Sequence, residues 1–148
     1  AQSLAFTEQG ETDLAQLCER ILAPYTTNPE AVVIGPGASV ELGPRMIVAL
    51  SLVLHELATN AAKYGALSAS GGEVRVSWKV GEEPRELRLK WAESGGPPVN
   101  PPSATGYGTE LIHSATTYSL GGQVDQDYAA GGLQAEIVIP LENASPPG

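Results

Sequence analysis

Apolar and polar positions near the start of the chain follow the period of helices. Residues 12–23 repeat apolar side chains at helical spacing, and Pro24 ends the repeat. A longer helix is predicted for residues 44–64, because a proline suits its first turn and Gly65 suits the position just past its end. One face of that helix is apolar, whereas another carries acid, amide and amine side chains. The long helix is therefore expected both to pack in a core and to present polar groups.

Later segments follow the two-residue period of strands. Alternating apolar residues on both sides of a polar turn predict an antiparallel hairpin. Trp78 and Trp91 fall on core-facing positions of this hairpin, and packing is the interpretation for both. The predicted strands are 31–34 and 40–42, which form two short strands or an edge hairpin, then 73–80 with 87–93, and finally 121–128 with 133–141.

A loop rich in Gly, Pro and Ser occupies residues 94–107, and a third helix is predicted for residues 108–119. Antiparallel strands with helices gathered on one side favour an α+β fold, built as a two-layer α/β sandwich. The length of 148 residues fits one domain, so the chain is interpreted as a single domain over residues 1–148. Its core is expected over about residues 12–141.

The composition excludes several classes of protein. Eight basic and 17 acidic residues give a formal net charge of −9, so nucleic acids and anionic membranes are unsuitable partners. A phosphate-bearing ligand would need a metal ion or a local positive site. The single cysteine, Cys18, lies on the apolar stripe of the first helix and is predicted to be buried and inert. No signal peptide or membrane-spanning run is visible, so a cytoplasmic domain of a longer protein is expected.

The long helix aligns Glu56, Asn60 and Lys63 at spacings of four and three residues. Mg²⁺ prefers oxygen ligands and keeps several waters, so an amide oxygen together with substrate phosphates can anchor it. A nearby carboxylate can accept a proton, and a lysine can meet phosphate charge. The row therefore suggests a phosphoryl-transfer site, although a solvated helix face would show the same pattern.

Two glycine-containing segments could complete such a site. Glu93 ends a strand and is followed by glycines, so its carboxylate could accept a hydrogen bond from an exocyclic amine such as that of adenine. Gly106 and Gly108 open the next helix, where free backbone N–H groups favour an anion. Taken singly, the alternatives are an ordinary turn after a strand and a flexible helix cap.

Together these segments resemble a known family. Residues 54–68, with the sequence LHELATNAAKYGALS, closely resemble the N box of HWE-type sensor histidine kinases. The tripeptide W-A-E at 91–93 resembles the W-x-E motif of that family, and residues 95–99 and 106–109 resemble its glycine boxes. The resemblance extends over about residues 14–141, which is most of the chain.

The resemblance implies the ATP-binding fold of the GHKL, or Bergerat, type. This fold has a mixed, mostly antiparallel sheet with helices on one face, and here residues 97–105 would form a lid over the nucleotide. Asn60 and Glu56 would hold Mg²⁺ and be the catalytic residues, with Glu56 acting as a base or through a metal-bound water. His55 would have a structural or site-organising role rather than be phosphorylated. The residues implied to bind ATP are His55, Asn60, Lys63, Tyr64, Glu93, Gly95, Gly106, Tyr107, Gly108 and Thr109.

By the same resemblance, the chain would be the catalytic domain of a protein-histidine kinase. It would transfer the γ-phosphoryl of ATP to a histidine on an upstream dimerisation and phosphoacceptor domain, for relay to a response regulator. That domain and the sensor domain are expected outside this chain, and the parent protein could be a homodimer. The alternatives are a nucleotide-binding regulatory module without phosphoryl transfer and a GHKL-type ATPase. His113 matches no motif and is interpreted as a surface or packing residue.

Overall fold

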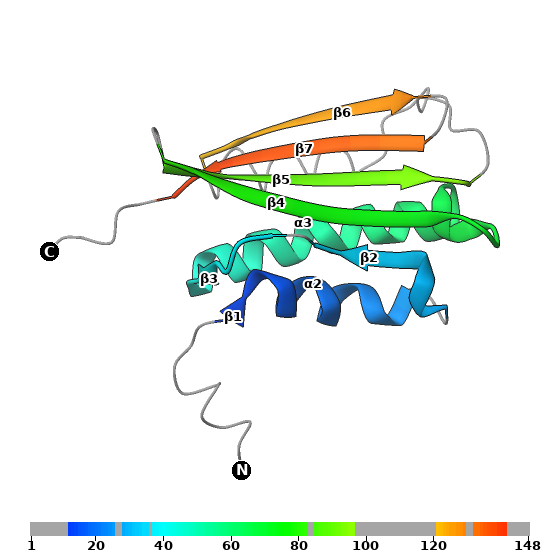
Figure 1. Ribbon diagram of the computed structural model, residues 1–148, viewed down its shortest axis with the longest axis horizontal. Helices are drawn as coiled ribbons and strands as arrows, with labels where there is room; N and C mark the ends of the chain where they lie inside the picture. Colours follow the sequence, from blue (N-terminus) through cyan, green and yellow to red (C-terminus); the bar gives the residue numbers. More distant parts are fainter. Residues whose placement is uncertain are drawn as a thin grey trace, which may run out of the picture.

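The computed structural model describes residues 12–25, 28–35, 37–82, 85–96, 121–129 and 132–141. These residues form two layers, a five-stranded sheet and a layer of helices on one of its faces (Figure 1). The two α-helices, α2 and α3, pack against each other under the sheet. The arrangement confirms the predicted two-layer α+β sandwich.

The sheet is mixed and mostly antiparallel, as the family resemblance implies. Its strand order is β2-β4-β5-β7-β6, and among these described strands only β2 and β4 run parallel. A separate antiparallel pair joins β1 to β3. The predicted hairpins β4–β5 and β6–β7 are both confirmed. The strands are β1 (Thr12–Asp13), β2 (Val32–Ile34), β3 (Glu41–Leu42), β4 (Glu73–Glu82), β5 (Arg85–Ser94), β6 (Gln123–Ala129) and β7 (Gly132–Pro140).

The two short strands β2 and β3 do not pair with each other, so the edge-hairpin alternative is wrong. β2 lies along the free edge of β4, and the N–H of Gly35 continues this pairing by donating to the carbonyl of Val76 at 2.7 Å. β3 instead pairs with β1, which directly precedes α2. The segments remain separate strands because each satisfies its backbone groups with a different partner.

Each α-helix begins where the sequence provides a start signal. Asp13 caps α2 (Leu14–Leu22), because its carboxylate accepts a hydrogen bond from the N–H of Ala15 at 3.0 Å. α3 (Pro44–Lys63) has its proline in the first turn, as predicted. The described residues also form three 3-10 turns: η1 (Ala23–Tyr25), η2 (Pro29–Ala31) and η3 (Ala66–Ser68).

The hydrophobic core lies between the sheet and the helices. The apolar face of α3 is buried through Leu50, Leu54, Leu57 and Ala61, none of which is exposed to solvent. Trp78 and Trp91 belong to the same buried cluster, so the packing interpretation is confirmed for both. Cys18 is also buried, and desolvation, with smaller effects from Asp13 and Glu19, raises the pKa of its thiol to about 12.

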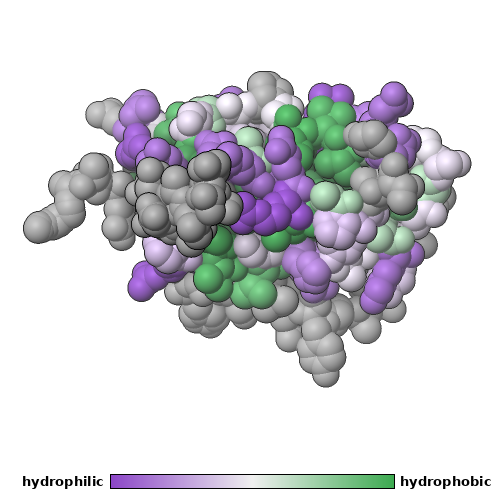
Figure 2. Space-filling model, turned by 90° about the horizontal axis from the view of Figure 1, so that it is seen from below, coloured by the Kyte–Doolittle hydropathy of each residue, from purple (hydrophilic) through white to green (hydrophobic). Residues whose placement is uncertain are grey.

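α3 is long and apolar enough to cross a membrane by length and composition alone, with a mean hydropathy of 1.2. Core helices can meet the same criterion, and the apolar stripe of α3 packs in the core of this domain. Figure 2 shows the molecule from the side on which α2 lies, where hydrophilic residues separate the apolar patches. Packing in the core therefore accounts for the apolar stripe of α3, whereas Val48 and Leu52 on the same helix are exposed.

Candidate functional site

The polar row of α3 lies beside its buried stripe. Glu56 and Asn60 are half-buried, and Lys63 is exposed in the last helical turn. Within the part of the chain that the structure describes, the side chains of these three residues form no hydrogen bond or ion pair. Their oxygen and ammonium groups are therefore free to meet a ligand, and the positive charge of Lys63 also suits the C-terminal end of a helix.

Glu93 is the most unusual side chain of the domain. It is 2% exposed, and among the described residues it is the one buried charged group. The indole N–H of Trp91 donates to Oε2 at 2.9 Å, and the backbone N–H of Ala66 donates to Oε1 at 3.0 Å. A carboxylate has about four acceptor positions, so these two bonds leave further capacity in a site withdrawn from water.

The hydrogen bond to Ala66 brings Glu93 to the end of α3. Ala66 begins η3, three residues after Lys63, so the buried carboxylate lies next to the segment that follows the polar row. Gly65 is required there, because a Cβ at this position would overlap Oε1 of Glu93. The adjoining Gly95 has a φ of +75°, a conformation that glycine adopts without strain. The chain thus joins the carboxylate, two glycines and the helix end in one place.

The described residues offer some of the ligands that a magnesium ion takes. No group of three or more His, Cys, Asp or Glu side chains suitable for a metal occurs among the described residues. Glu56 and Asn60, one helical turn apart, instead offer side-chain oxygen atoms that no described residue pairs with. Mg²⁺ is commonly bound by one or two such groups together with waters and substrate phosphates, so this donor set suits it.

His55 is engaged by a neighbouring segment. The hydroxyl of Tyr25 lies 2.7 Å from His55 Nδ1 and 3.1 Å from Thr59 Oγ1, and the rings of Tyr25 and His55 meet edge to face with centroids 5.5 Å apart. This cluster links η1 to α3. Tyr25 was not identified from the sequence, because it lies thirty positions before His55 and no helical or strand repeat connects the two.

Comparison with known proteins extends these observations. No family model matches the sequence. The chain is 42% identical over 137 residues to blue-light-activated histidine kinase 1 of Erythrobacter litoralis, covering 90% of this chain and 37% of that protein. It is 39% identical over 132 residues to a blue-light-activated histidine kinase of Brucella anthropi, covering 88% of this chain and 27% of that protein. The chain thus spans only about a third of the length of these relatives.

Solved structures show the same fold. The histidine kinase domain of the Erythrobacter litoralis EL346 blue-light-activated kinase aligns with a TM-score of 0.68 at 18% identity, covering 85% of this chain and 58% of that chain. The mycobacterial sensor histidine kinase MprB aligns with a TM-score of 0.64 at 20% identity, covering 88% of this chain and 97% of that chain. This chain is a relative of histidine kinases with the fold of their catalytic domain. The resemblance stated from the sequence is therefore confirmed.

In this histidine kinase-like domain, the first and last residues of the W-x-E motif contact each other. Trp91 and Glu93 are two residues apart on β5, so both side chains point to the inner face of the sheet. The hydrogen bond between them was not foreseen, although this two-residue spacing was a signal that could have found it. The tryptophan is thus a hydrogen-bond donor as well as a packing residue.

Several predicted site residues lie outside the described residues of the histidine kinase-like domain. These are Gly106, Tyr107, Gly108 and Thr109, together with the lid at 97–105, the helix at 108–119 and His113. Tyr64 is described and is 67% exposed at the end of α3. The structure therefore brings together Glu93, Gly95 and the end of α3, and leaves the second glycine box as a prediction.

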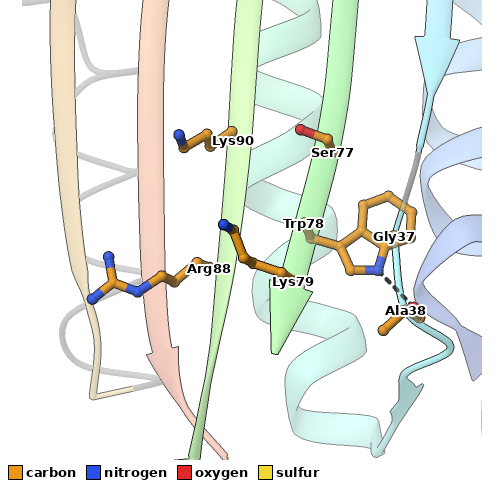
Figure 3. Close-up of a pocket in the computed structure, with 7 residues that line it drawn as sticks. All are labelled: Gly37, Ala38, Ser77, Trp78, Lys79, Arg88 and Lys90. Atoms are coloured by element: carbon orange, nitrogen blue, oxygen red, sulfur yellow. Dashed lines mark hydrogen bonds between the residues drawn. The ribbon is translucent and has the colours of Figure 1, made fainter. Parts of the chain in front are cut away.

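A hollow of about 490 Å³ lies elsewhere on this domain, over β4 and β5. Figure 3 shows its lining, in which Lys79, Arg88 and Lys90 project from the two strands and the indole of Trp78 donates to the carbonyl of Ala38. Neither the polar row of α3 nor Glu93 lines it. This basic hollow is therefore distinct from the predicted nucleotide site.

Proposed function

We propose that this domain binds ATP with Mg²⁺ and transfers the γ-phosphoryl group to a histidine of an upstream phosphoacceptor domain in the same protein. The observation that carries the proposal is the buried, partly satisfied Glu93 carboxylate beside the end of a helix whose Glu56, Asn60 and Lys63 side chains have no partner among the described residues. The relatives are named histidine kinases and are longer than this chain, which supports a multidomain parent protein.

The adenine end of the site would rest on Glu93. Its remaining acceptor positions suit the exocyclic amine of adenine, which donates two hydrogen bonds. A carboxylate has no hydrogen to offer, so a base with a carbonyl oxygen at that position would meet a second acceptor and be rejected. Gly95 would line the base through its backbone, because the side on which a Cβ would stand is filled by the backbone of Gly71. Tyr64 would then lie along the base.

The phosphate end would rest on α3. Asn60 and Glu56 would hold Mg²⁺, which when bound neutralises negative charge on the phosphates. Lys63 would add the single positive charge that the row contains. During transfer, the nitrogen–phosphorus bond would form as the bond from the γ-phosphorus to its bridging oxygen breaks. Glu56 would take up the proton that the imidazole gives up, either directly as a base or, when it holds Mg²⁺, through a water on the metal. The contribution of His55 would be to organise this end of α3 through Tyr25.

The wider setting follows from the same proposal. The phosphorylated histidine would pass its phosphoryl group to an aspartate of a response regulator, and the domain would work in the cytoplasm, where ATP is available. Gly106, Tyr107, Gly108 and Thr109 would hold the phosphates from the lid side. A net charge of −9 disfavours contact with nucleic acid or an anionic membrane.

Transfer of labelled γ-phosphoryl tests the activity. The chain is incubated with labelled ATP, Mg²⁺ and a phosphoacceptor domain, beside the variant Glu56→Gln and the control Glu41→Gln, which changes an exposed carboxylate on β3. Label should pass to the phosphoacceptor histidine with the native chain and the control, and fall by about 100-fold or more with Glu56→Gln. Nucleotide binding without transfer would instead indicate the regulatory module, and phosphate release to water alone would indicate an ATPase.

A further inference from the structure

We infer that Trp91 is a positioning residue whose indole N–H orients the Glu93 carboxylate toward the amine of the bound base. This inference rests on the proposed function, because it assigns Trp91 to the same nucleotide site. It goes beyond that function by making the two residues of the W-x-E motif one unit: an acceptor and the donor that aims it.

The geometry fixes both oxygens of Glu93. Oε2 accepts from Trp91 Nε1 at 2.9 Å, and Oε1 accepts from the backbone N–H of Ala66 at 3.0 Å. The last torsion of a glutamate side chain has a broad, roughly two-fold profile, so one hydrogen bond alone leaves the carboxylate plane poorly defined. Two donors on opposite oxygens determine that plane, and with it the directions of the remaining lone pairs.

Because both residues are buried, losing the hydrogen bond between Trp91 and Glu93 should be costly. Trp91 is 1% exposed and Glu93 is 2% exposed, so water cannot replace a lost donor without rearrangement. No lysine or arginine of the described residues forms an ion pair with Glu93. The charge is therefore held by neutral donors, and hydrogen bonds to charged groups are about twice as strong as neutral ones. Removing the indole N–H should leave a buried oxygen unsatisfied and the carboxylate free to turn.

Trp78 provides a matched control on the neighbouring strand. It is also buried, at 6% exposure, and its indole N–H also makes a hydrogen bond, to the carbonyl of Ala38 at 2.7 Å. Its partner is a backbone carbonyl rather than Glu93. Replacing either tryptophan by phenylalanine thus removes an indole ring and one hydrogen bond from the same core, but only one replacement touches the carboxylate.

The test compares two nucleotides that differ by a single group. One ligand is a non-hydrolysable ATP analogue; the other is the same analogue with unsubstituted purine in place of adenine, so that it lacks the 6-amino group. Each is titrated, in the presence of Mg²⁺, into the 148-residue chain and into the variants Trp91→Phe and Trp78→Phe. The native chain and Trp78→Phe should prefer the amino compound by about tenfold, the equivalent of roughly 1.4 kcal/mol. Trp91→Phe should lose most of that preference while its affinity for the purine compound stays nearly unchanged.

A merely structural tryptophan would weaken both nucleotides equally. An isostere guards against unfolding: replacing Trp91 by 3-benzothienylalanine keeps the ring shape and removes only the N–H, and it should also abolish the preference. If either Trp91 variant keeps the native preference for the amino compound, this inference is wrong and the proposed function still stands. Failure of the native chain to bind either nucleotide overturns the proposed function, and this inference with it.

Discussion

At the scale of single residues, the environment of Glu93 explains why small residues surround it. Gly65 has no side chain, and a Cβ there would overlap Oε1 of Glu93. Any larger residue must therefore push the carboxylate away from the N–H of Ala66, which breaks one of its two hydrogen bonds. Gly65 thus leaves room for the Glu93 carboxylate to keep its orientation; its role does not depend on an unusual backbone angle.

The variant Gly65→Ala tests this point. We expect the free energy of unfolding to fall by about 1–3 kcal/mol, as for other additions to a filled core, and nucleotide affinity to fall with it. Denaturant unfolding and calorimetry measure the two effects. Gly43→Ala is the control, because a Cβ at Gly43 would meet nothing within 4 Å; as the N-cap of α3 it should lose less than about 1 kcal/mol. Equal stability of the two variants would contradict the packing described around Glu93.

Cys18 gives a prediction that depends on pH. Burial raises the pKa of its thiol from 9.0 to about 12, so the native protein disfavours the reactive thiolate. We expect the native thiol at pH 8 to react with a disulfide reagent at least about 100-fold more slowly than in denaturant. The thiol's contribution to stability is fully present below its unfolded pKa and is lost as the pH rises toward 12. Rapid modification of the folded protein would show that Cys18 is accessible.

At the scale of elements, α3 performs two tasks on two faces, and this much could be predicted from the sequence. The helical spacing of the apolar residues predicts the buried stripe, and the spacing of Glu56, Asn60 and Lys63 predicts the polar row. The partners of β2 and β3 could not be predicted, because strands of two or three residues carry too little pattern to specify pairing. The link between Tyr25 and His55 was equally hidden, because it joins segments that only the fold brings together.

Truncating side chains on the two faces of α3 should lower the free energy of unfolding by different amounts. Leu54→Ala removes a fully buried side chain and should lower the free energy of unfolding by about 2–5 kcal/mol. Leu52→Ala removes a leucine that is 43% exposed on the same helix and should cost less than about 1 kcal/mol. Thermal or denaturant unfolding of both variants measures the difference. Similar losses would mean that the stripe of α3 is not the face that packs in the core.

At the scale of the whole molecule, the acidic charge limits how the domain can hold a nucleotide. A domain with a net charge of −9 and a nucleotide triphosphate repel each other, and Lys63 contributes a single cation to the polar row. A divalent ion held by Asn60 and Glu56, as proposed, would remove much of that repulsion. Binding is therefore expected to depend on the metal as well as on the protein.

Calorimetric titration with a non-hydrolysable ATP analogue, in Mg²⁺ and in excess EDTA, tests the central claim most directly. The native chain should bind at least about tenfold more tightly with Mg²⁺, a difference of roughly 1.4 kcal/mol. Asn60→Ala should lose this dependence, whereas Gln123→Ala, an exposed amide on β6, should keep it. Equally tight binding in EDTA would contradict the role of Asn60 as a metal ligand. Absence of binding by the folded native chain would contradict the nucleotide site itself.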